Sequence, residues 1–540
     1  MNHQSFALLL SVTLHHDLLI LLALLLVIVL LHMVSGRFGI SPPILLVLGG
    51  LGVSLFPGIP TVELDPDLVF LIFLPPLLYE AAWRTSWREF WGQRRAISLL
   101  AFGLVLFTAL TVGLITHSMI PGCTLALGIL IGGIVSPPDA VAATSVLGGM
   151  RVPKRVLTIL EGESLVNDAS SLIIFRFALA AVITGQFALG PAIGTFFYVS
   201  IVGIAVGLGV SGLMYLIHRY LPTTSAMDVA LTLVTPHLLY ISAESVHASG
   251  VLAVVCGGLF LTNRSSDFLN YRARIQANGA WETLSFILNG LVFLLIGLQM
   301  PMILRDLGMP PAPALFYACI VSVVIIASRP AWVFFSAYLR VWLSGGRSRP
   351  GLPPKALFLI SWAGMRGVVS LASALAIPLT LEDGSAFPMR NFILFTTFVV
   401  ILCTLVLQGL SLAPVIRALD LEVDGDPAVT YQLERRLRAR MAQAVVAHLD
   451  GNYAVELGQH EAFSRLRHNY ERLGSESLTE GDPQEPVLRE RYKKALVDLI
   501  LVRRQVLRSE RCESDLDLEI VRRMEEVLDH EEARIQGTRY

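Results

Sequence analysis

The chain has 540 residues, of which 54% are hydrophobic and only 15% are charged, and its mean hydropathy is +0.65. This composition excludes an ordinary water-soluble domain and predicts a protein that lies mostly in a membrane. The formal net charge of −1 gives no support to a nucleic-acid partner.

Apolar segments long enough to cross a bilayer recur from Leu18 to about Val415. No basic residue precedes the first of them and no small-residue cleavage site follows it, so we interpret it as a retained helix rather than a signal peptide. The short segment at 249–263 either crosses the bilayer or is partly re-entrant. We predict about thirteen transmembrane helices, at residues 17–35, 41–57, 67–83, 96–117, 123–148, 157–183, 191–218, 226–245, 249–263, 279–300, 312–339, 355–380 and 391–415.

The basic residues of the connecting loops alternate with the predicted helices. Sixteen lysines and arginines fall on one side of the membrane, and two, Arg305 and Arg390, fall on the other. Because positive loops stay inside, we expect the N-terminus outside and the C-terminus in the cytoplasm. After residue 416 the chain becomes rich in Arg, Glu and Asp. We predict a transmembrane domain at 1–416 and a cytoplasmic, mainly helical tail at 417–540, which either regulates or assembles the protein or is a solvated appendage.

Several charged and polar residues lie inside the predicted helices. A charge near the bilayer centre costs at least about 2.5–3.5 kcal/mol on insertion scales, so such groups are functional candidates unless they reach the interface. The candidates are Glu80, Asp139, Glu163, Ser164, Asn167, Asp168, Arg329 and Arg366.

Four of these candidates are close together in the sixth predicted helix. Ser164 and Asp168 are four residues apart, as are Glu163 and Asn167, so the helix presents one broad face rich in oxygen. Carboxylate, amide, hydroxyl and carbonyl oxygens are the ligands of a hard cation. Because buried carboxylates also bind protons, one site can hold either a cation or a proton.

The residues before Asp139 indicate an interrupted helix. Pro137 and Pro138 remove two amide donors and disfavour helix before them, so carbonyl groups are left free at membrane depth. Gly364 and Gly367 mark a second interruption around Arg366. Unwound backbone inside a membrane is tolerated where it lines a cavity, and two broken helices are typical of transporters with inverted repeats and a midplane site.

A structural explanation competes with ion binding for Asp139 and Asp168. Both aspartates would then only pair with Arg329 and Arg366 and hold helices together. Because Glu80 and Glu163 add further carboxylates, acid exceeds base, which favours ion binding.

At these residues the sequence resembles the monovalent cation:proton antiporter-1 family, the sodium/proton exchangers of bacterial NhaP and animal NHE type. The similarity covers nearly the whole predicted membrane domain and little of the tail. The matching stretches are Phe73–Glu80, Ser136–Val141, Gly162–Asp168, Asn289–Gln299 and Trp362–Gly367.

The resemblance implies an all-α membrane protein of thirteen helices with inverted repeats, which forms a homodimer. It also implies that Asp139 and Asp168 bind the ion and that Ser164 adds its hydroxyl, so these three residues would hold sodium. Glu80 would reach the ion through water, and Asn167 would hold the geometry of the aspartates.

Two further roles follow from the resemblance. Glu163 and Arg366 would form a buried ion pair that braces the crossing helices, and Arg329 would be a structural membrane arginine. Where some bacterial and archaeal relatives have threonine before the first aspartate, this chain has Pro138, which can offer the ion only its carbonyl.

The expected function is exchange of protons for sodium or lithium across the cell membrane, by alternating access, electroneutrally and in the service of pH homeostasis. A potassium/proton antiporter with the same mechanism is the alternative, and a cation channel is a weaker one. We find no hydrolase motif such as Gly-x-Ser-x-Gly or His-Glu-x-x-His, so we expect neither an enzyme nor a bound cofactor.

Overall fold

The structure, a computed structural model, divides into two compact units, Met1–Asp424 and Gly425–Tyr540. The predicted domain boundary at residue 416 falls in the last turn of the helix that ends at Leu419. The described residues are 3–38, 40–55, 69–147, 150, 152–185, 189–305, 307–343, 351–381, 384–421, 427–476, 491, 494–506, 524, 527–532 and 535.

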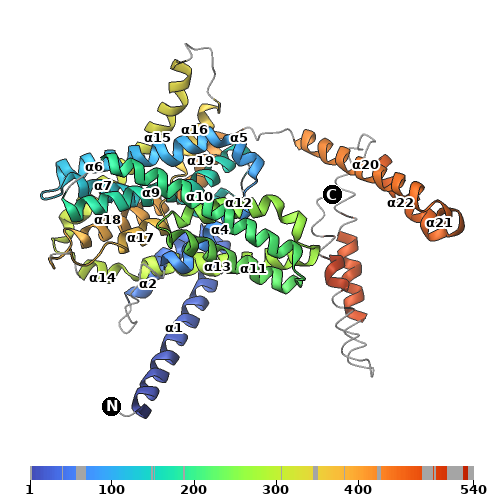
Figure 1. Cartoon of the computed structure of the whole chain (residues 1–540), viewed down its shortest axis with the longest axis horizontal. Helices are drawn as coiled ribbons and strands as arrows, with labels where there is room; N and C mark the ends of the chain where they lie inside the picture. Colours follow the sequence, from blue (N-terminus) through green and yellow to red (C-terminus); the bar gives the residue numbers. More distant parts are fainter. Residues whose placement is uncertain are drawn as a thin grey trace. The chain divides into compact units, whose positions relative to one another are not determined.

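The described part of the first unit is built from helices (Figure 1). Short π-helical segments lie before α4, between α5 and α6, and between α18 and α19. The helices are α1 (His3–Phe38), α2 (Pro42–Ser54), α4 (Leu74–Arg84), α5 (Trp87–Ser98), α6 (Val105–Met119), α7 (Leu125–Val135), α8 (Ala140–Leu147), α9 (Lys154–Thr184), α10 (Leu189–Tyr220), α11 (Ser225–Glu244), α12 (Gly250–Phe268), α13 (Tyr271–Leu298), α14 (Met300–Arg305), α15 (Pro311–Leu343), α16 (Pro354–Trp362), α17 (Val368–Leu375), α18 (Arg390–Cys403) and α19 (Gly409–Leu419).

Each predicted transmembrane segment overlaps at least one of these helices. Within the described residues, nine helical runs are long and apolar enough to cross a bilayer. The all-helical membrane class is therefore confirmed, while thirteen crossings and the side of each terminus stay predictions. The ends of the second and third predicted segments, near residues 57 and 67, lie outside the described residues.

The helices of the first unit pack into two groups. In one, which we call the crossing bundle, α6 packs on α7, α7 on α9, and α15 on α6 and α18; α5, α8, α16, α17 and α19 complete it. In the other, the flanking bundle, α10 packs on α12, α12 on α4, and α13 on α2, with α1 and α11 alongside. The helix α1 extends away from the rest of this group (Figure 1).

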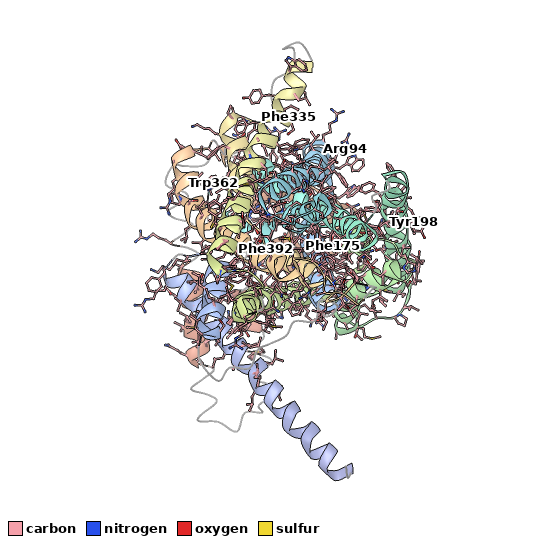
Figure 2. The ribbon with its side chains drawn as sticks, turned by 90° about the vertical axis from the view of Figure 1, so that its left-hand side faces the viewer. Arg94, Phe175, Tyr198, Phe335, Trp362 and Phe392 are labelled. Carbon is pink, nitrogen blue, oxygen red and sulfur yellow. The ribbon has the colours of Figure 1, made fainter. Side chains whose placement is uncertain are left out.

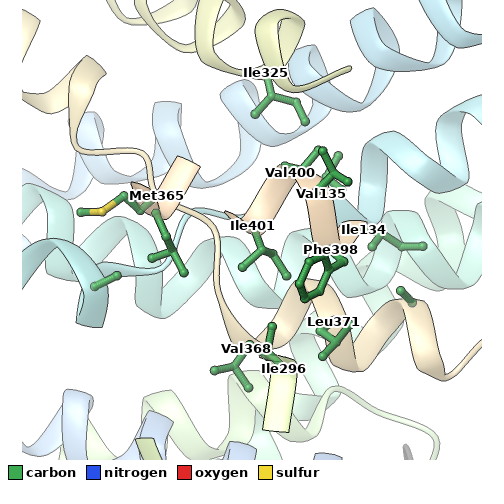
Figure 3. Packing of buried hydrophobic residues seen from close by; sticks show 14 of the residues in the cluster. Ile134, Val135, Ile296, Ile325, Met365, Val368, Leu371, Phe398, Val400 and Ile401 are labelled. Atoms are coloured by element: carbon green, nitrogen blue, oxygen red, sulfur yellow. The ribbon is translucent and has the colours of Figure 1, made fainter. Parts of the chain in front are cut away.

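The crossing bundle is closely packed. Gly128 lies against Gly113, and Gly132 lies against Ala109, so the backbones of α6 and α7 approach closely, as small residues allow in membranes. Apolar side chains from α7, α15, α17 and α18 meet in its interior, and Ile296 of α13, from the flanking bundle, packs against them (Figure 3). Phe175 and Phe392 are buried there, while Tyr198 is exposed on the flanking bundle (Figure 2).

Two helices of the crossing bundle are interrupted, as the sequence predicts. The first interruption, residues 136–139, separates α7 from α8 and contains Pro137 and Pro138. The second, residues 363–367, separates α16 from α17 and contains Gly364 and Gly367. Both interruptions lie within one bundle, so their unpaired backbone groups can satisfy each other.

The second unit contains α20 (Pro427–Asn452), α21 (Ala454–Gln459) and α22 (Glu461–Glu476). Arg467 of α22 forms an exposed ion pair with Asp450 of α20 at 2.7 Å. Farther along, Leu496 and Ile500 pack with Leu528 and Ile535, and Leu499 remains exposed. The described part of this region is helical, while a cytoplasmic location stays a prediction.

Candidate functional site

The two interrupted helices cross each other at the unwound segments. The amide of Asp139 donates a hydrogen bond to the carbonyl of Met365 at 2.8 Å. The guanidinium of Arg366 donates to the carbonyl of Ser136, and the amide of Arg366 donates to Thr404 Oγ1 at 3.1 Å. Each unwound segment thus satisfies part of the other's backbone, which a bilayer would otherwise leave unpaired.

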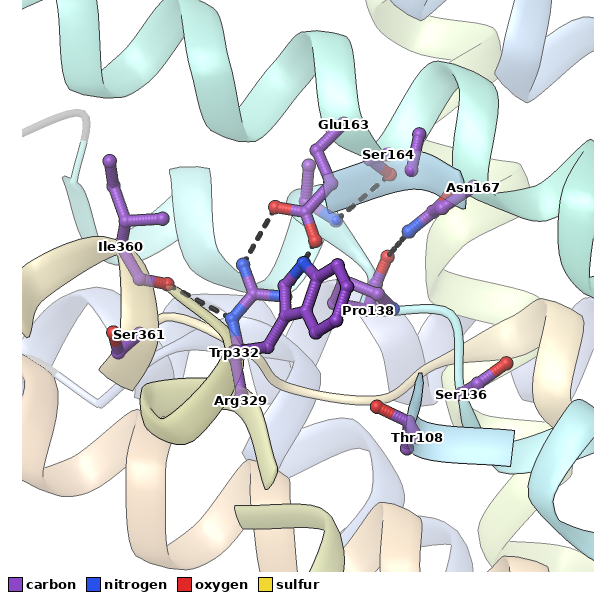
Figure 4. Close-up of polar contacts among 12 residues, drawn as sticks. Thr108, Ser136, Pro138, Glu163, Ser164, Asn167, Arg329, Trp332, Ile360 and Ser361 are labelled. Atoms are coloured by element: carbon purple, nitrogen blue, oxygen red, sulfur yellow. Dashed lines mark hydrogen bonds and ion pairs between the residues drawn. The ribbon is translucent and has the colours of Figure 1, made fainter. Parts of the chain in front are cut away.

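Helix α9 fixes the first unwound segment from the side. Asn167 Nδ2 donates to the carbonyl of Pro138 at 3.0 Å, and Ser164 Oγ accepts from the amide of Ala140 at 3.2 Å (Figure 4). The helix begins after Pro153 and ends before Gly185, whose φ of 67° is the left-handed conformation that glycine adopts readily. Its regular geometry places Ser164 and Asn167 against one short stretch of unwound chain.

Asp139 and Asp168 border the same cavity, which has a volume of about 470 Å³. Ser164 and Pro138 line it too. Asp139 Oδ1 accepts a hydrogen bond from the amide of Val141 at 2.8 Å, and Asp168 is only 7% exposed. Within the described residues neither aspartate forms an ion pair with lysine or arginine. The structure therefore brings both predicted aspartates to one cavity, with no described lysine or arginine paired to either of them.

Other acidic residues line the same cavity. Glu80 forms an ion pair with Arg84, whose side chain is 64% exposed, and Glu161 and Glu282 also border the cavity. Glu282 is not among the candidates from the sequence, although an acid inside the predicted helix 279–300 is itself a signal. The cavity thus carries a strongly acidic lining from its outer part to Asp168.

The space on the other side of Val368 is closed by apolar residues. Phe73, Val292, Ile296 and Leu371 line a gap of only about 10 Å³ there. Val368 borders both spaces, and charged residues are found only in the described lining of the large cavity.

The predicted partner of Glu163 is wrong. Its carboxylate pairs with Arg329, with oxygen–nitrogen distances of 2.6 and 2.7 Å, rather than with Arg366 (Figure 4). Arg329 Nε also donates to the carbonyl of Ile360 at 3.0 Å. Because residues 363–367 are unwound, helical spacing does not predict the direction of the Arg366 side chain, which turns to Ser136 instead.

Arg366 is fully buried, and its Nε and Nη2 atoms have no hydrogen-bond partner among the described residues. Among the described residues, the guanidinium of Arg366 donates to the Ser136 carbonyl. This contact indicates that Arg366 stabilises the unwound backbone where the two helices cross. Glu163 and Arg329 form a bidentate ion pair in which each side chain neutralises the charge of the other.

Comparison with known proteins gives the family. The model for the transmembrane sodium/hydrogen exchanger matches residues 20–418. The chain belongs to the sodium/hydrogen exchanger family. This range covers α2 to α18, so all the site residues described above lie within the matched range.

Curated members of this family are similar over most of the chain. An uncharacterised Na⁺/H⁺ exchanger of Mycobacterium tuberculosis is 33% identical over 534 residues, which are 96% of each chain. The Na⁺/H⁺ antiporter ApNhaP of Aphanothece halophytica is 33% identical and covers 80% of each chain. The sodium, potassium, lithium and rubidium/H⁺ antiporter of Bacillus subtilis is 36% identical, over 73% of this chain and 61% of its own length.

A solved structure agrees with the fold. The sodium proton antiporter MjNhaP1 of Methanocaldococcus jannaschii superposes with a TM-score of 0.59 over 76% of this chain and 100% of its own. Its sequence identity is 19%, so the likeness shows the fold. Family and fold are those of ion antiporters.

Proposed function

We propose that the protein exchanges sodium ions for protons across a cell membrane. The observation that carries this proposal is the shared cavity of Asp139, Asp168 and Ser164, in which the buried carboxylate of Asp168 and the partly buried carboxylate of Asp139 have no cationic side-chain partner among the described residues. The family and its curated members, which are named as Na⁺/H⁺ antiporters, support the same function.

Sodium and protons compete for the two aspartates in this mechanism. Asp139, Asp168 and Ser164 supply oxygen to sodium, and protonation of the carboxylates releases it. Asn167 and Pro138 keep the unwound segment in place through their hydrogen bond, with the Pro138 carbonyl as a further oxygen. Bare carboxylates are too costly to occlude, so the site crosses only when a cation or a proton neutralises it.

Alternating access requires the site to open to the other side. The crossing bundle carries Asp139 and Asp168, while the flanking bundle supplies Glu80 and Glu282 to the lining of the cavity. Movement of the crossing bundle against the flanking bundle would close the cavity and open the apolar gap behind Val368. Glu80, held by Arg84, would then contact the ion through water only from the open side.

The same proposal includes one-for-one electroneutral exchange, a homodimer, and a multi-pass protein with an outside N-terminus and a cytoplasmic C-terminus. The positive-inside pattern of the loops supports this orientation. The role in the cell would be control of sodium and pH.

Proteoliposomes with a preset pH gradient test the proposal. Sodium should dissipate the gradient at a rate independent of an imposed membrane potential, and Asp168→Asn should lower that rate by at least about 100-fold while the protein stays folded. Asp267→Asn, which removes an exposed acid at the end of α12, is the matched control. Lithium, potassium and rubidium are compared in the same assay; normal sodium flux in the Asp168→Asn variant would contradict the assignment.

A further inference from the structure

A second cavity of about 460 Å³ lies within the crossing bundle, between α5, α9, α15 and α16. It shares no lining residue with the cavity that Asp139 and Asp168 border, which we call the ion cavity. Its walls are apolar and include Leu100, Ile159, Val333, Leu357 and Ile360, all of them buried. Such walls fit a hydrocarbon chain and offer nothing to a hydrated ion.

Three arginines stand at the rim of this cavity. Arg94, Arg95 and Arg155 line it and are exposed, and no aspartate or glutamate is among its described lining residues. Arg94 lies over the ring of Trp91, 5.1 Å from its centroid. Arg95 and Arg155 form no ion pair within the described residues, so the rim carries uncompensated positive charge.

Two exposed tryptophans lie on α5, the helix that carries Arg94 and Arg95. Trp87 and Trp91 of α5 are 41% and 52% exposed, and exposed tryptophan beside arginine is typical of the membrane interface. Glu89, the acid on the same helix, accepts a hydrogen bond from Thr158 and does not line the cavity. Arg94 and Phe335 lie at the same end of the crossing bundle (Figure 2).

We propose that this cavity binds an anionic phospholipid. The phosphodiester contacts Arg94, Arg95 and Arg155, and one acyl chain lies along the walls formed by Val333 and Leu357. Clustered basic residues at a membrane surface attract anionic headgroups, and the apolar walls select a lipid over a free phosphate ion. This site is independent of the proposed ion exchange, because no residue of it belongs to the ion cavity.

The lipid would lie directly behind the buried ion pair. Ile360, a wall residue, gives its carbonyl to Arg329, and Ile159 lies one helical turn before Glu163. A chain held in the cavity therefore supports the side of α9 and α16 that carries the pair, and it moves with the crossing bundle.

Native mass spectrometry of the purified full-length protein tests the proposal. With phosphatidylglycerol, cardiolipin or phosphatidylcholine added, the wild type should retain the two anionic lipids and release phosphatidylcholine. Arg95→Gln/Arg155→Gln should weaken retention about 20-fold, because each basic residue contributes to the attraction. Arg272→Gln/Arg274→Gln removes two exposed arginines from the flanking bundle and should retain lipid as the wild type does.

A second variant tests the acyl site without changing the charge. Ala337→Trp fills the cavity from α15 and should also abolish retention. Equal retention by the Arg95→Gln/Arg155→Gln protein, retention by Ala337→Trp, or displacement of the lipid by millimolar inorganic phosphate would each overturn the proposal. Size-exclusion chromatography confirms that every variant compared is folded.

Discussion

Glu163 and Asp168 are two buried carboxylates on one helix, and their surroundings are opposite. Glu163 receives two short hydrogen bonds from Arg329. Asp168 borders the ion cavity with Asp139 and has no ion-pair partner within the described residues. The two acids are five positions apart in the sequence, which places them about 140° apart around the helix.

The difference shows how one helix can carry both a structural and a transport charge. At Glu163 the protein supplies the counter-charge, so that charge is constant. At Asp168 the proposed counter-charge is a proton or a cation. The net charge of this site then depends on which ion is bound. In the proposed mechanism, carboxylates therefore stabilise the bundle on one face of α9 and exchange ions on another.

Removal of the Glu163 charge should have the largest effect on stability. Glu163→Gln strands the buried Arg329, and loss of one partner of a buried pair costs about 3–5 kcal/mol. Unfolding in detergent should show this loss, whereas Asp168→Asn should not lower stability in the same assay. If Asp168→Asn proves the more destabilising change, the contrast between the two faces fails.

A double variant separates the pair from its individual residues. Glu163→Met/Arg329→Met should recover most of the stability lost in Glu163→Gln, because neither charge is then left buried alone. Glu163→Met/Arg366→Met should give no such recovery, since Arg366 contacts Ser136.

Two glycines of one unwound segment offer an intermediate test. A Cβ at Gly364 would overlap Arg329, and a Cβ at Gly367 would overlap Asp139. Overpacking costs about 1–3 kcal/mol, so Gly364→Ala should mainly lower stability and Gly367→Ala should mainly slow exchange. Gly212→Ala on α10, where a Cβ meets nothing within 4 Å, should change neither unfolding nor proton flux.

The exposed pair of Asp450 and Arg467 should have the smallest effect. The hydrogen bond from Arg467 holds the pKa of Asp450 below its usual range. Because the pKa is lowered on folding, this stabilisation is present above the ordinary aspartate value of about 3.9 and is lost as pH falls through the folded value.

Asp450→Asn should therefore slightly speed hydrogen exchange of α20 and α22 at pH 7 and leave sodium-driven proton flux unchanged. A large loss of flux would show that an exposed ion pair of the tail controls transport.

Much of the membrane fold could be predicted because its signals are local. Apolar length marks each helix, and Pro137, Pro138, Gly364 and Gly367 mark the interruptions within a few residues. The four-residue spacing of Ser164 and Asp168 likewise predicts that they share one face of a helix. In the structure both line the same cavity as Asp139.

The choice of ion-pair partner could not be predicted in the same way. Arg329 and Arg366 are both intramembrane arginines, and only the packing of α15 and α16 against α9 distinguishes them. Glu282 was missed because its place on the cavity wall depends on how the flanking bundle meets the crossing bundle. Contacts between segments that are far apart in the chain produce no periodic pattern in a single sequence.

The distance along the chain between Glu163 and Arg329 has a consequence for biogenesis. The two residues are 166 positions apart, so α9 is synthesised long before its counter-charge exists. Until α15 follows, α9 carries Glu163 into the membrane without its counter-charge, at a cost of about 2.5–3.5 kcal/mol for an acid near the membrane centre. We therefore expect the stable insertion and packing of α9 to be completed late in assembly, after the second half of the chain has emerged from the ribosome.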